Sequence, residues 1–148
     1  MVLDRTGRVA HREPWRPNTL AREGEQNILD TWLREHSPAG KYLCLLTEAA
    51  DDQTTMDSMR ELAGAGYARQ PVPASDWSEP VVAGDNYQCQ ARAKIFGPAA
   101  APWTVAAVAL VSTAVGYAGK FLLSVTLAEP VHVAAGQSYY YTLRVKAV

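Results

Sequence analysis

The chain has 148 residues, of which 48% are hydrophobic, and 15 acidic side chains against 14 basic ones give a net charge of -1. This length fits one domain with a core of its own, and the hydrophobic content excludes a disordered chain. The near-neutral balance provides no field that attracts phosphates or anionic lipids, so neither nucleic acid nor a membrane is expected as a partner. The charged N-terminus does not read as a secretory signal, and the longest apolar run is too short to span a bilayer. We expect a protein made in the cytoplasm.

Residues 1–20 show no period and mix charged residues with two prolines. They predict an extended N-terminal arm, followed by a single domain over 21–148. Trp15 is a candidate anchor for a partner's pocket, with packing on its own domain as an equal alternative. Arg12 and Arg16 belong to a basic set that would favour an acidic neighbouring surface. Because ordering a residue costs about 1–2 kcal/mol and the arm has few apolar side chains, we expect it to be ordered only in an assembled particle.

Residues 19–36 predict the main helix, because they carry one apolar stripe at helical spacing, namely Ile28, Leu29, Trp32 and Leu33. The apolar run 41–47 predicts a strand that is covered on both faces. A capping pattern in the segment 54–62 predicts a short second helix, and Gly64 is placed to end it in a left-handed conformation.

The hydrophobic period changes to two from Gly66 onward. Strand-like segments follow, separated by turn signals, at 67–72, 86–96, 102–112, 120–127 and 138–148. The first contains a proline and is expected at a sheet edge, whereas the third is apolar on both faces and is expected at the centre, with Trp103 packed in the core. The sequence therefore predicts a mainly β fold, a β-sandwich of jelly-roll or Greek-key type, with one N-terminal amphipathic helix and one short helix.

Side chains that could carry chemistry are few. Cys44 and Cys89 each lie in an apolar strand-like segment and are expected as buried thiols rather than as a disulfide or a nucleophile. The three histidines lack Cys, Asp or Glu neighbours at ligand spacing, so no metal site is expected. Asp51 and Asp52 are expected to be solvated at the start of the short helix, with a weak cation site as the alternative. No catalytic residues, cofactor or enzymatic activity are expected.

The stretch ELAGAGYARQPV contains two glycines spaced as in a phosphate-binding loop. Such a loop follows a strand, precedes a helix and has a third glycine. Here the predicted order is reversed and the third glycine is absent, so a phosphate site is rejected. Gly64 and Gly66 are expected to let the chain leave a helix and enter a sheet with positive φ angles.

The stretch also resembles a phrase found in small virion structural proteins of tailed bacteriophages, which are often labelled tail-fibre-like. In that family a helix ends in Glu-Leu-(small)-Gly-(small)-Gly-Tyr-Ala-Arg-Gln, and residues 61–70 match it, including Tyr67 and Gln70. A Trp-Thr-Val strand and a late VAAG turn extend the resemblance over about residues 23–145. This chain has prolines where the relatives continue with an apolar strand, which leaves the path of residues 71–80 open.

The resemblance implies a non-enzymatic part of a virion, with major capsid or tail proteins as partners and a homo-oligomer or another symmetric assembly as its state. A capsid decoration (cement) protein, clipped to its neighbours by the arm, is the first interpretation. A tail-fibre or baseplate accessory protein is the alternative. In either case Arg69 is expected to pair with a backbone carbonyl or with a carboxylate brought near by the fold, and it is also a candidate interface residue.

A carbohydrate-binding module is an alternative of a different class. Its sandwich loops would present aromatic side chains as stacking platforms, and the candidates are Trp77, Trp103 and Tyr117. Of these, Trp77 is the one that the sequence places in a loop, and it is also a candidate interface residue.

Overall fold

The computed structural model describes residues 1–3, 6–11, 16, 18–33 and 40–146, and for residues 10, 30, 32 and 33 this description covers the backbone alone. The described chain is mainly β, with one α-helix, α1 (Arg22–Leu33), and one 3-10 turn, η1 (Ala74–Asp76). Its strands are β1 (Val2–Leu3), β2 (Val9–His11), β3 (Thr19–Leu20), β4 (Tyr42–Leu46), β5 (Gln70–Pro71), β6 (Val81–Ala83), β7 (Asn86–Gln90), β8 (Lys94–Phe96), β9 (Trp103–Val111), β10 (Phe121–Val133), β11 (Ser138–Tyr141) and β12 (Arg144–Lys146). The predicted mainly β fold with a leading helix is confirmed.

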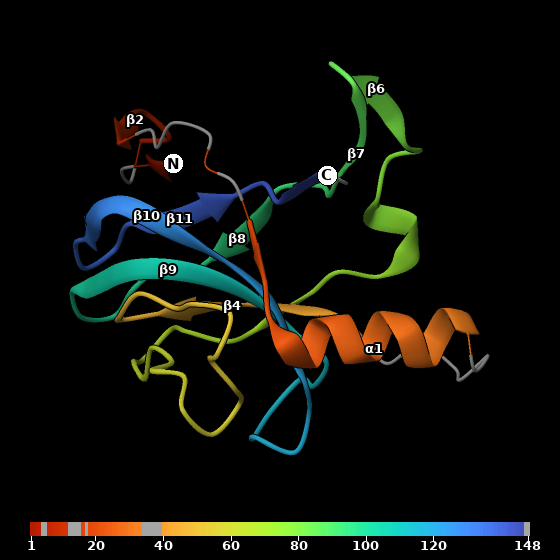
Figure 1. Ribbon diagram of the computed structural model, residues 1–148. Coiled ribbons are helices and arrows are strands. Elements are labelled where there is room, and N and C mark those ends of the chain that lie inside the picture. Colours follow the sequence, from red (N-terminus) through yellow and green to blue (C-terminus); the bar gives the residue numbers. More distant parts are fainter. Residues whose placement is uncertain (4–5, 12–15, 17, 34–39, 147–148) are drawn as a thin grey trace.

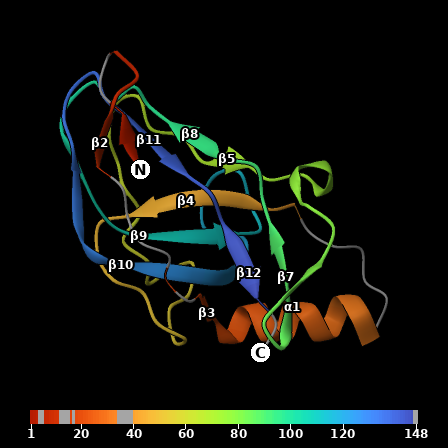
Figure 2. The same cartoon turned by 90° about the horizontal axis from the view of Figure 1, so that it is seen from above.

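The strands form three antiparallel sheets. Their orders are β2-β1-β11-β8, β3-β10-β9-β4-β5 and β12-β7-β6. The four-stranded sheet lies above the five-stranded sheet, and α1 lies below it (Figures 1 and 2), so the arrangement is that of a β-sandwich with one outer face partly covered. The predicted strand 86–96 is divided between two sheets, because β7 pairs with β6 and β12 whereas β8 pairs with β11.

The centre of the five-stranded sheet, formed by β4, β9 and the first half of β10, is buried on both faces. One face packs against the four-stranded sheet in a cluster that includes Phe96, Tyr139 and Val105. The opposite face, with Cys44 and Phe121, is covered by side chains of the segment that follows β4 and by the start of α1. Burial of both faces explains the continuous apolar runs of β4 and β9, and β9 is central as predicted, with β5 at the sheet edge.

Helix α1 docks through its first turn rather than through its apolar stripe. A Cβ atom on Gly24 would overlap the carbonyl of Leu122, so only glycine allows this close approach to β10. Glu23 accepts a hydrogen bond from the Phe121 amide at 2.8 Å. The predicted core-facing stripe is wrong for Ile28 and Leu29, which are 52% and 54% exposed, because the helix leaves the sheet beyond its first turn. The other two stripe side chains, those of residues 32 and 33, lie outside the described residues.

The short helix predicted over 54–62 is wrong, since these residues form turns. Thr55 and Ser58 make reciprocal bonds between side-chain oxygens and backbone amides, which closes one turn. A helix cannot continue because the following backbone pairs with the end of β4: the Leu62 amide donates to Leu45 at 2.9 Å. The apolar side chains of the segment, those of Met56, Met59 and Leu62, are buried in the core.

The described parts of the predicted arm pair with their own chain. Strand β1 pairs with β11, and β3 pairs with β10. Val2 is 1% exposed and belongs to the inter-sheet core. The expectation that the arm is ordered only through another subunit is therefore wrong for residues 1–3 and 19–20. These residues bury little apolar area, but their backbone hydrogen bonds with β11 and β10 add to the stabilisation. The division of the chain at residue 20 stays a prediction.

No helix in the described part of the chain is long and apolar enough to cross a membrane.

Candidate functional site

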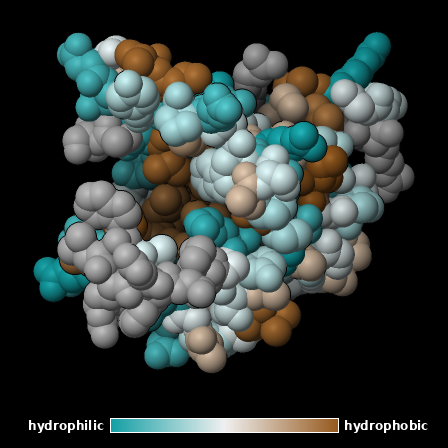
Figure 3. Space-filling view, turned by 90° about the vertical axis from the view of Figure 1, so that its right-hand side faces the viewer, coloured by the Kyte–Doolittle hydropathy of each residue, from teal (hydrophilic) through white to brown (hydrophobic). Residues whose placement is uncertain are grey.

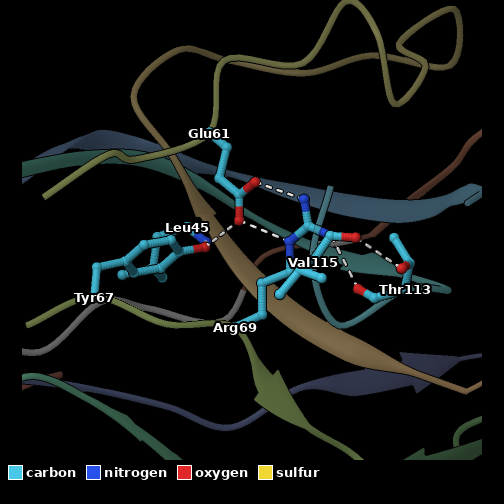
Figure 4. A network of polar contacts seen from close by, with 6 residues as sticks. All are labelled: Leu45, Glu61, Tyr67, Arg69, Thr113 and Val115. Atoms are coloured by element: carbon cyan, nitrogen blue, oxygen red, sulfur yellow. Dashed lines mark hydrogen bonds and ion pairs between the residues drawn. The ribbon is translucent and has the colours of Figure 1, made fainter. Parts of the chain in front are cut away.

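Three side chains of the stretch 61–72, those of Glu61, Tyr67 and Arg69, form a network of polar contacts (Figure 4). Arg69 forms a bidentate pair with Glu61, with Nε donating to Oε1 at 2.8 Å and Nη2 donating to Oε2 at 2.6 Å. Its Nη1 donates to the carbonyl of Thr113 at 2.9 Å. The hydroxyl of Tyr67 donates to Glu61 Oε1 at 2.6 Å and accepts from the Leu45 amide at 3.2 Å. Arg69 thus has both kinds of partner that were expected, a carbonyl and a carboxylate.

The network joins three separate segments of the chain. Glu61 forms an isolated bridge with Leu46 at the end of β4, Arg69 precedes β5, and Thr113 lies in the loop between β9 and β10. The two charged side chains are 13% and 4% exposed. Because each buried charge is paired and hydrogen-bonded, the network fixes the relative position of the three segments rather than leaving a charge free for chemistry.

Burial and pairing also shift the protonation equilibria of the network and of the neighbouring Cys44. The hydrogen bond with Glu61 raises the pKa of Arg69, and burial, with Cys44 and Glu61 nearby, raises the pKa of Tyr67 far above its usual value. Burial raises the pKa of the Cys44 thiol to about 12. The tyrosine and the thiol therefore keep their protons at neutral pH, and neither is a base or a nucleophile there. In the described part of the chain, His, Cys, Asp and Glu side chains form no group of three that could hold a metal ion.

The two glycines of the stretch have different roles. Gly66 has a φ of +88°, and a Cβ there would overlap the Pro98 carbonyl. Gly64 does not adopt a positive φ, so its predicted left-handed helix cap is wrong. Instead, a Cβ at Gly64 would lie 2.8 Å from Nε1 of Trp103, which is 3% exposed and packs edge-on against Tyr67. Gly64 thus provides room for an indole that sequence reasoning had placed in the core.

A surface cleft of about 520 Å³ is lined in part by Trp77, the aromatic residue that the sequence had placed in a loop. The path of residues 71–80 runs from β5 through η1 to Trp77, which bridges to Ala91. Trp77 is half-buried, and its side chain packs against the inter-sheet core while also lining the cleft. Its polar neighbours in this Trp77 cleft are Ser75, Asp76, Ser78, Gln88, Gln90 and Arg92.

Two projecting elements expose large apolar side chains. The β6–β7 hairpin extends away from the two stacked sheets in Figure 1, and Val81, Val82 and Tyr87 on it are 51%, 66% and 60% exposed. The loop between β9 and β10 exposes Val115 and Tyr117. The sequence had indicated Trp77 as the one candidate aromatic in a loop, and Tyr117 is therefore a second one. Figure 3 shows the face at the β6–β7 end of the molecule, which is hollowed and has apolar atoms within the hollow. Such exposed apolar areas are typical of contact surfaces.

The structure places the remaining candidate residues as follows. Gln70 donates to the Ala68 carbonyl at the start of β5, and Arg16 is exposed. Trp15 and Arg12, and the side chain of Trp32, lie outside the described residues. Cys44 is a buried free thiol as predicted, whereas Cys89 is only half-buried. The interface roles proposed for Arg69 and Trp77 stay predictions.

Sequence reasoning missed Glu61, Thr113 and the cleft residues of β7. The spacing of Glu61 and Arg69, eight residues apart on two extended segments, carries no helical signal that would have linked them. The neutral, alternating sequence of β7 predicted a strand but not a wall of a cleft.

No match is found among the curated proteins. The model of one family, described as "Podophage GP4 fiber I protein gp80", matches residues 20–145, which include the Glu61–Arg69 network, the Trp77 cleft and both projecting elements. A structural protein of a phage virion, as the sequence had suggested, is thereby supported. The chain belongs to the family of the podophage GP4 fiber I protein gp80.

Proposed function

We propose that this protein is a non-enzymatic fibre component of a podophage tail, held in the virion by contacts with other virion proteins. The observation that carries the proposal is the family match over residues 20–145. The description of that family favours the tail-fibre alternative over the capsid decoration protein that was our first interpretation. A homo-oligomeric or other symmetric state remains part of the proposal.

The described structure is consistent with a role in contacts rather than in catalysis. Its buried ionisable side chains are paired or protonated, as Arg69 and Tyr67 illustrate. Several of its exposed apolar side chains lie on the β6–β7 hairpin and the β9–β10 loop, where a neighbouring protein can bury them.

The test is the location and copy number of the protein in purified virions of the phage that encodes it. We expect quantitative mass spectrometry to give a small number of copies per particle, and tails separated from heads to retain them. Antibody labelling in electron microscopy should mark the tail. Hundreds of copies that remain with isolated heads would support the capsid decoration role and overturn the fibre proposal.

A further inference from the structure

Lys94 is a charged residue on the inner side of the four-stranded sheet. It alternates along β8 with the exposed Ile95, and it therefore shares a face with Phe96, which is fully buried in the inter-sheet core. On the neighbouring strand β11 it lies opposite Tyr141, whose side chain packs against the same core. The side chain of Lys94 thus lies at the border of the sandwich interior, where a charge needs a partner.

The partner of this amine is a carboxylate from the segment that follows β5. Nζ of Lys94 and Oδ2 of Asp76 are in direct contact, and the two side chains are each 14% exposed. The amide of Asp76 donates to the carbonyl of Pro73 at 3.0 Å, and its carbonyl accepts from the Arg92 amide at 2.9 Å. The backbone of η1 is thereby tied to the residue two positions before Lys94, which holds the carboxylate against the amine.

This pair is poorly satisfied as a pair of ions. Among the described residues, neither Nζ of Lys94 nor the carboxylate of Asp76 has a further hydrogen-bond partner. The Glu61–Arg69 pair differs, because both carboxylate oxygens and a backbone carbonyl accept from the guanidinium. A largely buried ion pair without such additional bonds does not recover the cost of removing two charges from water. Any reaction that removes both charges relieves this cost.

We propose that Lys94 and Asp76 join spontaneously in an intramolecular isopeptide bond. The ammonium group first transfers a proton to the carboxylate, and the lone pair of the neutral amine then attacks Cγ of Asp76. The bond from Cγ to the protonated oxygen breaks, and this hydroxyl leaves as water with a second proton from the nitrogen. One ammonium and one carboxylate thus become one amide and one water molecule, and no oxidant, cofactor or other reactant is consumed.

The fold provides the two conditions that this reaction needs. Groups held in contact with suitable orientation react as though each were present at an effective molarity of about 10⁵–10⁸ M. Burial also disfavours the charged reactants relative to the uncharged amide. The bond joins β8 to a segment 18 residues earlier in the chain and closes a loop within one chain. It is therefore independent of the fibre role proposed above, and either proposal can fail without the other.

The mass of the full-length protein tests the proposal. We expect the folded protein, analysed by intact mass spectrometry after denaturation, to be lighter than its sequence by one water molecule. Trypsin should fail to cut after Lys94, and residues 70–92 should be found joined to residues 93–120. Fragmentation of this branched peptide should place the link between the side chains of Asp76 and Lys94.

Variants separate the covalent bond from the ion pair. Lys94→Arg keeps the positive charge, but its guanidinium does not lose a proton and cannot attack the carboxyl carbon, so this variant should have the full mass of its sequence. Asp76→Ala should also have the full mass. Lys120→Arg is the matched control, because the amine of Lys120 is hydrogen-bonded to the exposed Gln26 rather than to a carboxylate, and it should retain the loss of one water. The result for the unmodified sequence stands even where a variant does not fold.

Three results would overturn the proposal. The first is a folded protein that has the full mass of its sequence and keeps it on prolonged incubation. The second is complete tryptic cleavage after Lys94. The third is a loss of one water that persists in Lys94→Arg, which would show dehydration elsewhere in the chain rather than a cross-link at this pair.

Discussion

At the scale of single residues, Glu61 is the residue on which the Tyr67–Arg69 network depends. Its Oε1 accepts from two side chains and its Oε2 from a third donor, all within 2.8 Å. Removing one partner of a buried ion pair leaves the other charge desolvated, whereas removing both partners avoids that cost. The network is therefore most sensitive to single substitutions.

We expect Arg69→Met to lower the free energy of unfolding by about 3 kcal/mol, because Glu61 then stays buried without its cation. The double variant Glu61→Leu with Arg69→Met should be less destabilised than the sum of the single variants. Urea denaturation measures all three, with Arg60→Met as an exposed control. A change of less than about 0.5 kcal/mol for Arg69→Met, which is typical of surface sites, would show that the pair does not anchor these segments.

Cys44 predicts a dependence of stability on alkaline pH. Burial raises its pKa from 9.0 to about 12, so the folded state binds the thiol proton more tightly than the unfolded state does. The resulting stability is fully present below pH 9 and is lost as the pH rises toward 12. We expect Cys44→Ala to have a flatter stability curve over this window, measured by urea denaturation at each pH. Above pH 10 Tyr67 adds a loss of the same sign, which Tyr67→Phe removes.

Alkylation provides a check on the same residue. Iodoacetamide should modify the half-buried Cys89 in the native protein and reach Cys44 only after unfolding. Native-state labelling of Cys44 at the rate of Cys89 would contradict its burial.

At the scale of elements, α1 shows how a close approach can replace an apolar stripe. Gly24 lets the first turn contact the backbone of β10, and no other residue type fits at this distance. Alanine has the higher helix propensity by about 1 kcal/mol, so propensity alone predicts that Gly24→Ala is stabilising.

We expect the opposite outcome for Gly24→Ala. The added methyl group must displace the helix from Leu122, and the free energy of unfolding should fall by about 1–3 kcal/mol. Thermal and urea denaturation measure the change. Glu25→Ala, on the exposed side of the same turn, is the matched control and should have little effect. Stabilisation by Gly24→Ala would show that the first turn does not pack closely on β10.

The β6–β7 hairpin is an element whose apolar side chains point away from both sides of its ribbon. Val81 and Val82 are consecutive, so they face opposite sides, and both are exposed. We expect Val82→Asp to fold with an unchanged melting temperature but to be depleted from virions, because a charge opposes burial in an interface. Mass spectrometry of particles measures the depletion, with Arg60→Asp as the control. Full incorporation of Val82→Asp would exclude the hairpin as a contact surface.

Sequence patterns predicted the elements whose own residues indicate their place in a sheet. The run at β9 is apolar on both faces and could only be central, and the proline of β5 indicated an edge. The patterns failed where a distant segment decides the structure. Residues 54–62 have a capping pattern, but their backbone pairs with β4, and Arg69 reaches Thr113 across 44 residues. Strand β1 has two residues, which is too short to show any period.

At the scale of the whole molecule, the described N-terminal residues are part of the sandwich. Val2 fills the space between the sheets, and β1 separates β2 from β11. This position gives the arm a structural role in its own domain, in addition to the contact with another subunit that we continue to propose for it.

We therefore expect deletion of residues 1–11 to lower the melting temperature and the free energy of unfolding by more than about 2 kcal/mol, since it removes a buried side chain and the pairing of β11. Calorimetry and urea denaturation measure this. Deletion of residues 1–11 with no loss of stability would show that β1 contributes nothing to the stability of the sandwich. It would favour the original interpretation, in which the arm is ordered only in an assembled particle.

The pairing of β1 with β11 also has a consequence for the order in which the protein folds. The amino group of Met1 donates to the carbonyl of Tyr140, a separation of 139 residues. During synthesis β1 leaves the ribosome long before its partner strand β11, which lies more than one hundred residues later in the chain. Contacts of such long separation form slowly because a large loop must close before they are gained. The sheet that contains β4, β9 and β10 can assemble earlier, and we expect the first strand of the chain to be among the last to reach its place.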